Sequence, residues 1–185
     1  MQLLIPTLAV STLVFLSGCV SPAKIDYDRS AVPAMANYRC FAIDNREARA
    51  DYQELTLSPI VDRRIESAIE TTLRAQGFRS DCGTPDFRVT FSTITETKTE
   101  IADLRVGPTP FRREPYFGYG EFSPLWVQEF EEGTFIIDII DRERSELVWR
   151  GVHKERLGWD APNDSEVLAI VAKLLADFPP TDPLK

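Results

Sequence analysis

Few residues in this 185-residue chain have side chains that could do chemistry, and its single histidine is the first to consider. A Ser–His–Asp or Cys–His arrangement would need His153 as its base. Residues 154–156, Lys-Glu-Arg, follow it directly, and the sequence contains no nucleophile-elbow motif. We therefore interpret His153 as a residue of an exposed strand and predict no catalytic residues.

Two aspartates interrupt the apolar run from Phe135 to Asp141. Asp138 and Asp141 are three positions apart, so on a strand they face opposite sides, whereas paired catalytic carboxylates must converge. Asp141 fits a turn. Asp138 needs a partner if buried, and Arg150 across the predicted hairpin can supply a structural ion pair. With one histidine and no clustered ligand spacing, we expect neither a metal site nor a cofactor.

The cysteine chemistry begins at Cys19, which ends a short apolar run. Residues 3–16 are too short and too interrupted to span a bilayer but suit the apolar region of a secretory signal peptide. The run closes with Leu16-Ser17-Gly18-Cys19, which resembles a bacterial lipoprotein signal whose cysteine thiolate accepts the lipid. No Lys or Arg precedes Cys19, so either the start lies upstream or export tolerates an uncharged leader.

The resemblance to a lipoprotein signal implies a multiply acylated cysteine, which anchors stably at about 0.8 kcal/mol per buried CH2. Val20 follows Cys19 in place of the Asp that retains lipoproteins in the inner membrane. We therefore expect residues 1–18 to be a signal peptide and residues 19–37 to be the lipidated cysteine and a tether, in which Ile25-Asp26-Tyr27 could form a short strand. The expected location is the periplasmic face of the outer membrane.

Cys40 and Cys82 remain once Cys19 carries lipid. Two cysteines in an oxidising compartment favour a disulfide, and a strand–helix–strand unit with parallel strands would bring these two together. The alternative is a buried Cys40 with an exposed thiol at Cys82.

The charge balance of the chain limits the classes of molecule that it could bind. A net charge of −8 and a pI near 4.8 exclude nucleic acid, because phosphate binding needs a cationic surface. The same charge argues against adsorption to anionic lipid. An apolar fraction of 43% is ordinary for a globular domain.

The periodicity of the mature chain predicts an α+β domain over residues 38–180, with a tail over 181–185. The expected order is a strand at 38–43, an exposed loop at 44–54, a helix from Ser58-Pro59 to Gly77, and a strand from 86 that projects beyond the core. A hairpin over 133–152, covered on both faces and with Trp149 beside Gly151, precedes a second helix capped by Asp164 or Ser165. We predict a mixed four-stranded sheet with both helices on one face.

Residues 105–132 form an unusual insert, rich in proline, glycine and aromatic residues. Loops of this length are uncommon in compact domains and often functional. One interpretation is a binding surface for a glycan or small ligand, and the other is an arm whose rings pack back onto the sheet. The candidate binding residues are Phe111, Tyr116, Phe117, Tyr119 and Trp126.

The hairpin carries a family resemblance. The run Glu132-Gly133-Thr134-Phe135-Ile136-Ile137-Asp138-Ile139-Ile140-Asp141, followed by Glu146-Leu147-Val148-Trp149-Arg150-Gly151, resembles the bacterial DUF4136 lipoproteins. Ser58-Pro59, Gly77-Phe78, Pro85-Asp86 and Phe178-Pro179 also fit, and the likeness covers about residues 25–180. It implies a periplasmic, membrane-anchored domain of undefined function, with no catalytic residues to carry over and a variable insert.

The expected function is therefore a non-enzymatic, lipid-anchored envelope protein that acts as a binding or assembly module with an unknown envelope partner. A glycan or small-ligand binder that uses the insert is the alternative. An envelope hydrolase has the least support.

Overall fold

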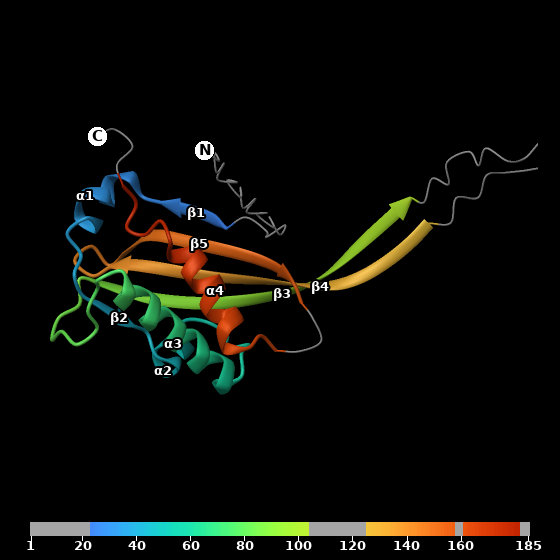
Figure 1. Ribbon diagram of the computed structural model, residues 1–185, viewed down its shortest axis with the longest axis horizontal. Helices are drawn as coiled ribbons and strands as arrows, with labels where there is room; N and C mark the ends of the chain where they lie inside the picture. Colours follow the sequence, from blue (N-terminus) through green and yellow to red (C-terminus); the bar gives the residue numbers. More distant parts are fainter. Residues whose placement is uncertain (1–22, 104–124, 158–160, 182–185) are drawn as a thin grey trace, which may run out of the picture.

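A computed structural model describes residues 23–103, 125–157 and 161–181, with side chains described outside 101–127 (Figure 1). Its centre is one sheet of five strands in the order β1-β5-β4-β3-β2. The strands are β1 Lys24–Tyr27, β2 Phe41–Ile43, β3 Phe87–Asp103, β4 Leu125–Asp141 and β5 Glu146–Arg156. The helices are η1 Arg29–Ala31, α1 Val32–Met35, α2 Arg46–Ala50, α3 Pro59–Ala75 and α4 Asp164–Leu175.

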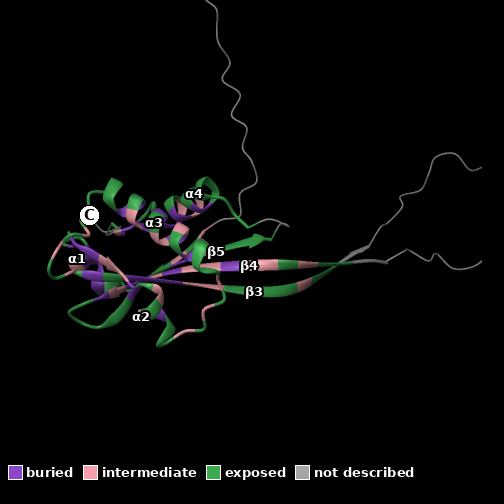
Figure 2. Ribbon diagram, turned by 90° about the horizontal axis from the view of Figure 1, so that it is seen from below, coloured by how far each residue is buried: buried purple, intermediate pink, exposed green. Residues whose placement is uncertain are grey.

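The sheet is mixed, because β2 runs parallel to β3 while the other neighbours are antiparallel. Both long helices, α3 and α4, cover the same face (Figure 2). The predicted α+β class, mixed sheet and helix placement are confirmed, but the described sheet has five strands, not four. The additional strand is β1, which pairs with the outer edge of β5.

The predicted tether at 19–37 is corrected from Lys24 onward, although the short strand considered at Ile25-Asp26-Tyr27 is confirmed as part of β1. Residues 24–37 belong to the domain: β1 joins the sheet, and the short helices η1 and α1 follow it. Ala31 and Met35 are fully buried. Small and apolar side chains in this stretch fill the end of the core, which composition alone does not distinguish from a linker.

Helix α3 begins and ends as its sequence predicts. The Ser58 hydroxyl accepts a hydrogen bond from the Val61 N–H, and Pro59 occupies the first helical position. Gly77, with a φ of 96°, ends the helix in the left-handed conformation that glycine adopts without strain. One stripe of α3 is buried against the sheet and α4: Ile65, Ala68, Ile69, Thr72 and Leu73.

Helix α4 begins one residue earlier than predicted. Its N-cap is Asn163, not Asp164 or Ser165, and the Glu166 side chain completes a capping box. Two contacts show that α3 and α4 run in the same direction. Arg64 in the second turn of α3 contacts Asp164 at the start of α4, and Gln76 donates to the Leu175 carbonyl at the ends of the two helices.

Aromatic rings form the centre of the core between helices and sheet. Phe87 stacks on Tyr38 with centroids 5.0 Å apart and meets Phe178 edge-on at 5.4 Å. Trp149 in turn packs edge-on against Phe178 at 5.6 Å. The side chains of Phe87 and Trp149 are at most 1% exposed. These rings join β3, β5 and the segment after α4 into one cluster.

The second face of β4 is less covered than predicted. Ile136, Asp138 and Ile140 alternate along this face and are each half-buried. The predicted loop at 44–54 also contains a helix, α2, capped by the Asn45 side chain. Helix α2 follows the three-residue strand β2 in the chain. Just after α2, the Gln53 side chain donates a hydrogen bond to the Phe91 carbonyl of β3.

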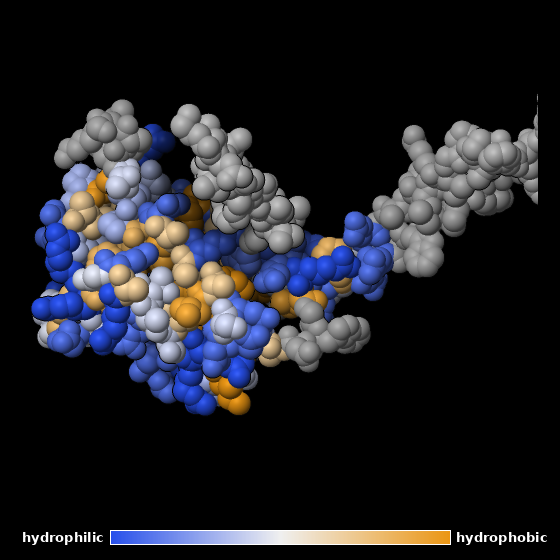
Figure 3. All heavy atoms as spheres, in the orientation of Figure 1, coloured by the Kyte–Doolittle hydropathy of each residue, from blue (hydrophilic) through white to orange (hydrophobic). Residues whose placement is uncertain are grey.

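Strands β3 and β4 project beyond the sheet as a two-stranded arm (Figure 1). Residues 97–103 pair with 125–131 past the last pairing of β4 with β5, at Glu132 and Arg156. This unsupported ladder is about 23 Å long at a rise of about 3.3 Å per residue. Residues 125–132 of the predicted insert are therefore strand. The described surface of the arm is mainly hydrophilic (Figure 3).

Gly151 lies where the core tolerates no side chain. A Cβ there would lie 2.6 Å from a ring carbon of Trp149 and 3.3 Å from a methyl of Leu174. We expect Gly151→Ala to lower the free energy of unfolding by about 1–3 kcal/mol, because the buried ring must move. Urea unfolding measures this loss. Gly83→Ala is the control, since nothing lies within 4 Å of its Cβ, and an equal effect of the two changes would contradict the packing argument.

Candidate functional site

Several predicted site residues lie outside the part of the chain that the structure describes. These are Cys19 and, in the insert, Phe111, Tyr116, Phe117 and Tyr119. Trp126 belongs to β4 by its backbone, but its side chain is not described. A candidate site among the described residues must therefore be built from the cysteines, the charged residues and His153.

Cys40 and Cys82 form a disulfide with their Cα atoms 6.3 Å apart. Cys40 precedes β2 and makes a parallel bridge with Arg79, so the chain after α3 returns beside β2. The sequence separation is 42 residues, and closing a loop of that size stabilises the fold by about 4 kcal/mol in the chain-entropy model. The bond therefore ties the return from α3 to the beginning of β2.

Asp138 and Arg150 form the predicted pair across β4 and β5. Arg150 Nε and Nη2 each donate to one carboxylate oxygen of Asp138 at 2.7 Å. These hydrogen bonds raise the pKa of Arg150 above its usual value. The Arg150 side chain is 46% exposed, so the pair contributes on the order of 1 kcal/mol or less. Its geometry is that of a structural link on the open face.

His153 is buried, contrary to its interpretation as an exposed residue. It is 5% exposed because it lies on the face of β5 that the helices cover, opposite Phe135. Its Nε2 lies 3.5 Å from the Glu155 carboxylate, and its Nδ1 has no hydrogen-bond partner among the described residues. Among the described residues, no hydrogen bond joins either ring nitrogen to a hydroxyl or a thiol.

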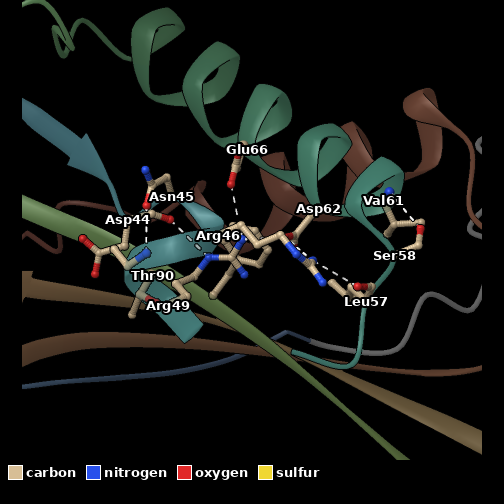
Figure 4. Close-up of polar contacts among 12 residues, drawn as sticks. Asp44, Asn45, Arg46, Arg49, Leu57, Ser58, Val61, Asp62, Glu66 and Thr90 are labelled. Atoms are coloured by element: carbon tan, nitrogen blue, oxygen red, sulfur yellow. Dashed lines mark hydrogen bonds and ion pairs between the residues drawn. The ribbon is translucent and has the colours of Figure 1, made fainter. Parts of the chain in front are cut away.

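The strongest polar cluster was missed by sequence reasoning and is centred on Arg49 (Figure 4). Arg49 is 1% exposed, and its Nη2 lies 2.8 Å from Asp62 Oδ2. Arg46 reaches the same oxygen at 2.7 Å, and Glu66 lies 3.3 Å from Arg49. The Arg49 guanidinium also covers the Phe91 ring at 3.7 Å. We call Arg46, Arg49, Asp62 and Glu66 the arginine cluster.

The arginine cluster joins α2 to α3 and β3. Burial raises the pKa of Glu66, and Arg49 opposes that effect. The adjoining cavity, which Asp62 lines, holds only about 10 Å³, which is close to the volume that a single water centre needs. A substrate does not fit there, so the cluster is a structural connection. Within the described ranges, no group of three His, Cys, Asp or Glu side chains could hold a metal ion.

The signal for this cluster was local and weak. Asn45 is a good N-cap, and Glu47 lies in the first helical turn, where a negative charge is favourable. A five-residue helix rich in charge has no apolar stripe, however. Burial of Arg49 depends on carboxylates from α3, which lies beyond the loop that follows α2.

A second buried contact joins the segment before β2 to the end of β4. The Tyr38 hydroxyl donates to the Asp141 carboxylate, which also accepts the Arg144 N–H at 2.8 Å. Burial acts to raise the pKa of Asp141, but the hydrogen bonds from Tyr38 and the turn outweigh it and hold this pKa below its usual range. Burial and the nearby carboxylate raise the pKa of Tyr38.

Comparison with known proteins bears on the fold and the family. The family model "Domain of unknown function (DUF4136)" matches residues 23–180. A search of curated proteins gave no match. No described helix is long and apolar enough to cross a membrane.

Among solved structures, the chain is similar to a PDZ domain protein from Parabacteroides distasonis. The identity is 20% and the TM-score 0.51, over 88% of this chain and 36% of that one. The present chain therefore spans about a third of the length of that protein, and the likeness supports the fold alone. Two PelC dodecamer structures from Paraburkholderia phytofirmans match at 13% and 12% identity and TM-scores of 0.46 and 0.45. They cover 83% of this chain and 93% and 94% of theirs.

The arginine cluster predicts an asymmetric response to mutation. Asp62→Ala leaves the Arg49 guanidinium buried without its nearest carboxylate, and we expect a loss of about 3–5 kcal/mol in unfolding free energy. Glu66→Gln should cost less than about 1 kcal/mol, because Glu66 is 29% exposed.

The double change Arg49→Met with Asp62→Leu should recover most of the loss, since it removes both buried charges together. Urea unfolding of the variants measures each value. Equal losses for Asp62→Ala and Glu66→Gln would show that the cluster is not a buried ion pair.

The Tyr38–Asp141 contact predicts a pH dependence. Folding lowers the pKa of Asp141. The contribution of the ionised carboxylate to stability is therefore fully present above the unfolded-state pKa of about 3.9, and it is lost as the pH falls through the folded-state pKa. Tyr38→Phe should therefore lower the free energy of unfolding by about 1.5–3 kcal/mol at pH 7 and by less at pH 3. Urea unfolding across this range tests it, with Tyr27→Phe as the control. A cost that stays constant with pH would refute the coupling.

Proposed function

Since this chain belongs to the DUF4136 family, a domain of unknown function, we propose a role from its own residues. It is a non-enzymatic, lipid-anchored protein that acts as a binding or assembly module at the periplasmic face of the outer membrane. The observation that carries the proposal is the sequence Leu16-Ser17-Gly18-Cys19 at the end of a short apolar run. Val20 after the cysteine favours the outer membrane.

The disulfide supports the compartment independently of the signal. Disulfides persist in oxidising compartments such as the bacterial periplasm and are rare in the cytosol. The bond between Cys40 and Cys82 leaves Cys19 as the cysteine available for lipid, since the chain has three cysteines. The disulfide and the separate Cys19 are thus both consistent with an exported protein.

The described polar residues support binding over catalysis. Asp138 is held by Arg150, and Asp62 is held by two arginines. His153 is buried and contacts only Glu155 among the described polar groups. These contacts stabilise the fold and use the groups that a hydrolytic site would need.

The short stretch of chain between the lipidated cysteine and the domain would hold the domain close to the membrane. Cys19 and the first residue of β1, Lys24, are five positions apart, so their Cα atoms lie at most about 18 Å from each other at about 3.6 Å per residue. The domain carries a net negative charge and gains nothing from anionic lipid. In this proposal the lipid alone holds the β1 edge of the sheet near the membrane.

Cys19→Ala tests the anchor. We expect the variant to stay unlipidated and to leave the membrane fraction or remain unprocessed, while intact mass of the natural chain shows a cleaved, acylated Cys19. The control is the pair Cys40→Ala and Cys82→Ala, which removes the disulfide and should leave fractionation unchanged. Non-reducing peptide mapping of the same samples reports the disulfide. Unchanged mass and membrane fractionation of Cys19→Ala would refute the proposed anchoring.

A further inference from the structure

The outer edge of β1 is a free sheet edge among the described residues. Strand β1 stands at the end of the strand order, with β5 as its neighbour. The Asp28 N–H donates to the Val148 carbonyl at 2.9 Å. Since backbone groups alternate in direction along an antiparallel strand, the N–H and C=O groups of Ile25 and Tyr27 point away from β5. They form a template to which another strand can pair.

A groove runs along this edge on the side of the helices. It has a volume of about 410 Å³ and is lined by Ile25 and Tyr27 of β1 and by residues 176–181 after α4. This volume lies within the range of about 300–1,000 Å³ that ligand-binding pockets occupy. Ile25 and Tyr27 are half-buried and pack against the core, so their outer surfaces form an apolar wall. Pro179 and Pro180 also line the groove, and neither has a backbone N–H.

The charges at the groove favour a cationic partner. Asp177 lines it, is exposed, and makes no ion pair with the residues that the structure describes. The other aspartates near β1 are engaged differently: Asp28 lies 3.7 Å from Arg144, and Asp26 lies opposite Arg150 in the register. The net charge of −8 on the whole chain also favours a cationic partner.

We propose that this groove binds an extended segment of a partner protein, which adds a strand to the free edge of β1. Its alternate apolar side chains lie against Ile25 and Tyr27, and a Lys or Arg lies beside Asp177. Main-chain hydrogen bonds provide affinity in such strand addition, and alternate side chains provide specificity. The inference rests on the proposed role as a binding module and names the site and the chemistry of its partner.

The probe is the labelled peptide acetyl-Val-Thr-Lys-Thr-Val-Thr-amide, which presents Val, Lys and Val on one face of a strand. Fluorescence anisotropy with the full lipidated chain in detergent should give saturable binding. The same peptide N-methylated at alternate residues should bind at least about tenfold more weakly, because it loses two or more backbone hydrogen bonds. Amide hydrogen exchange at Ile25 and Tyr27, whose N–H groups face away from β5, should slow about tenfold with the unmethylated peptide.

A charge exchange tests the role of Asp177. Asp177→Lys should weaken binding of the Lys peptide about fivefold and strengthen binding of its Glu counterpart, through one surface ion pair. Asp81→Lys is the matched control, since Asp81 is also exposed and does not line the groove, and it should change neither affinity.

Four results would overturn the inference. They are no saturable binding up to millimolar peptide, equal binding of the N-methylated peptide, exchange protection of the Ile25 and Tyr27 amides in the free monomer, and the same protection in a dimer. The third would show that the chain covers its own edge, and the fourth that a second copy does. Repeating the titration with Cys19→Ala separates the two proposals, because loss of the anchor leaves peptide binding unchanged.

Discussion

Packing of aromatic rings between the sheet and the parallel helices α3 and α4 is the constraint on which the rest of the structure depends. Phe87 lies at its centre, in contact with Tyr38, Phe41, Phe78 and Phe178. These residues come from both ends of the domain, so the cluster holds the chain together over its whole length. Such rings bury large areas, and their edge-on contacts add about 0.5–1.5 kcal/mol each beyond that burial.

That core covers one face of the sheet and leaves the polar contacts to organise its margins. The arginine cluster fixes α2 beside α3 where the short strand β2 ends. The disulfide fixes the return from α3 beside Cys40, and Tyr38 fixes the far end of β4 through Asp141. These contacts border the core, since Tyr38 also stacks on Phe87 and Arg49 lies over the Phe91 ring. Arginines pair with the Asp62 carboxylate, whereas the Asp141 carboxylate accepts hydrogen bonds from the Tyr38 hydroxyl and the Arg144 N–H.

Two parts of the sheet remain open to other molecules in the described structure. The arm of β3 and β4 carries Lys98 beside Glu96 and Arg156 over the Phe130 ring at 4.0 Å, so local charge and ring contacts support its base. The β1 edge lies beside a groove and within a short chain length of Cys19. A lipid anchor at that cysteine and a strand-binding groove at β1 would bring a partner close to the membrane surface.

The sequence alone determined the elements whose signals are local. Ser58-Pro59 and Gly77 bounded α3, the β-branched run bounded the end of β4, and Trp149 beside Gly151 indicated a close approach. It also offered Arg150 as a candidate partner for Asp138, but the register shift between Ile139 and Ile140 decides that pairing, since the turn by itself would place Asp138 opposite Trp149. The family resemblance of the hairpin is confirmed by the match over residues 23–180.

Only the tertiary structure decided the features that depend on distant partners. Residues 28–37 looked like a tether until the core supplied contacts for Ala31 and Met35, and the short strand at 25–27 had no partner until β5 lay beside it. Arg49 looked exposed until α3 supplied its carboxylates, and His153 until the helices covered its face of β5. The physical reason is the same in each case: caps and turns are satisfied by neighbours in sequence, whereas burial is set by surfaces that meet only when the chain has folded.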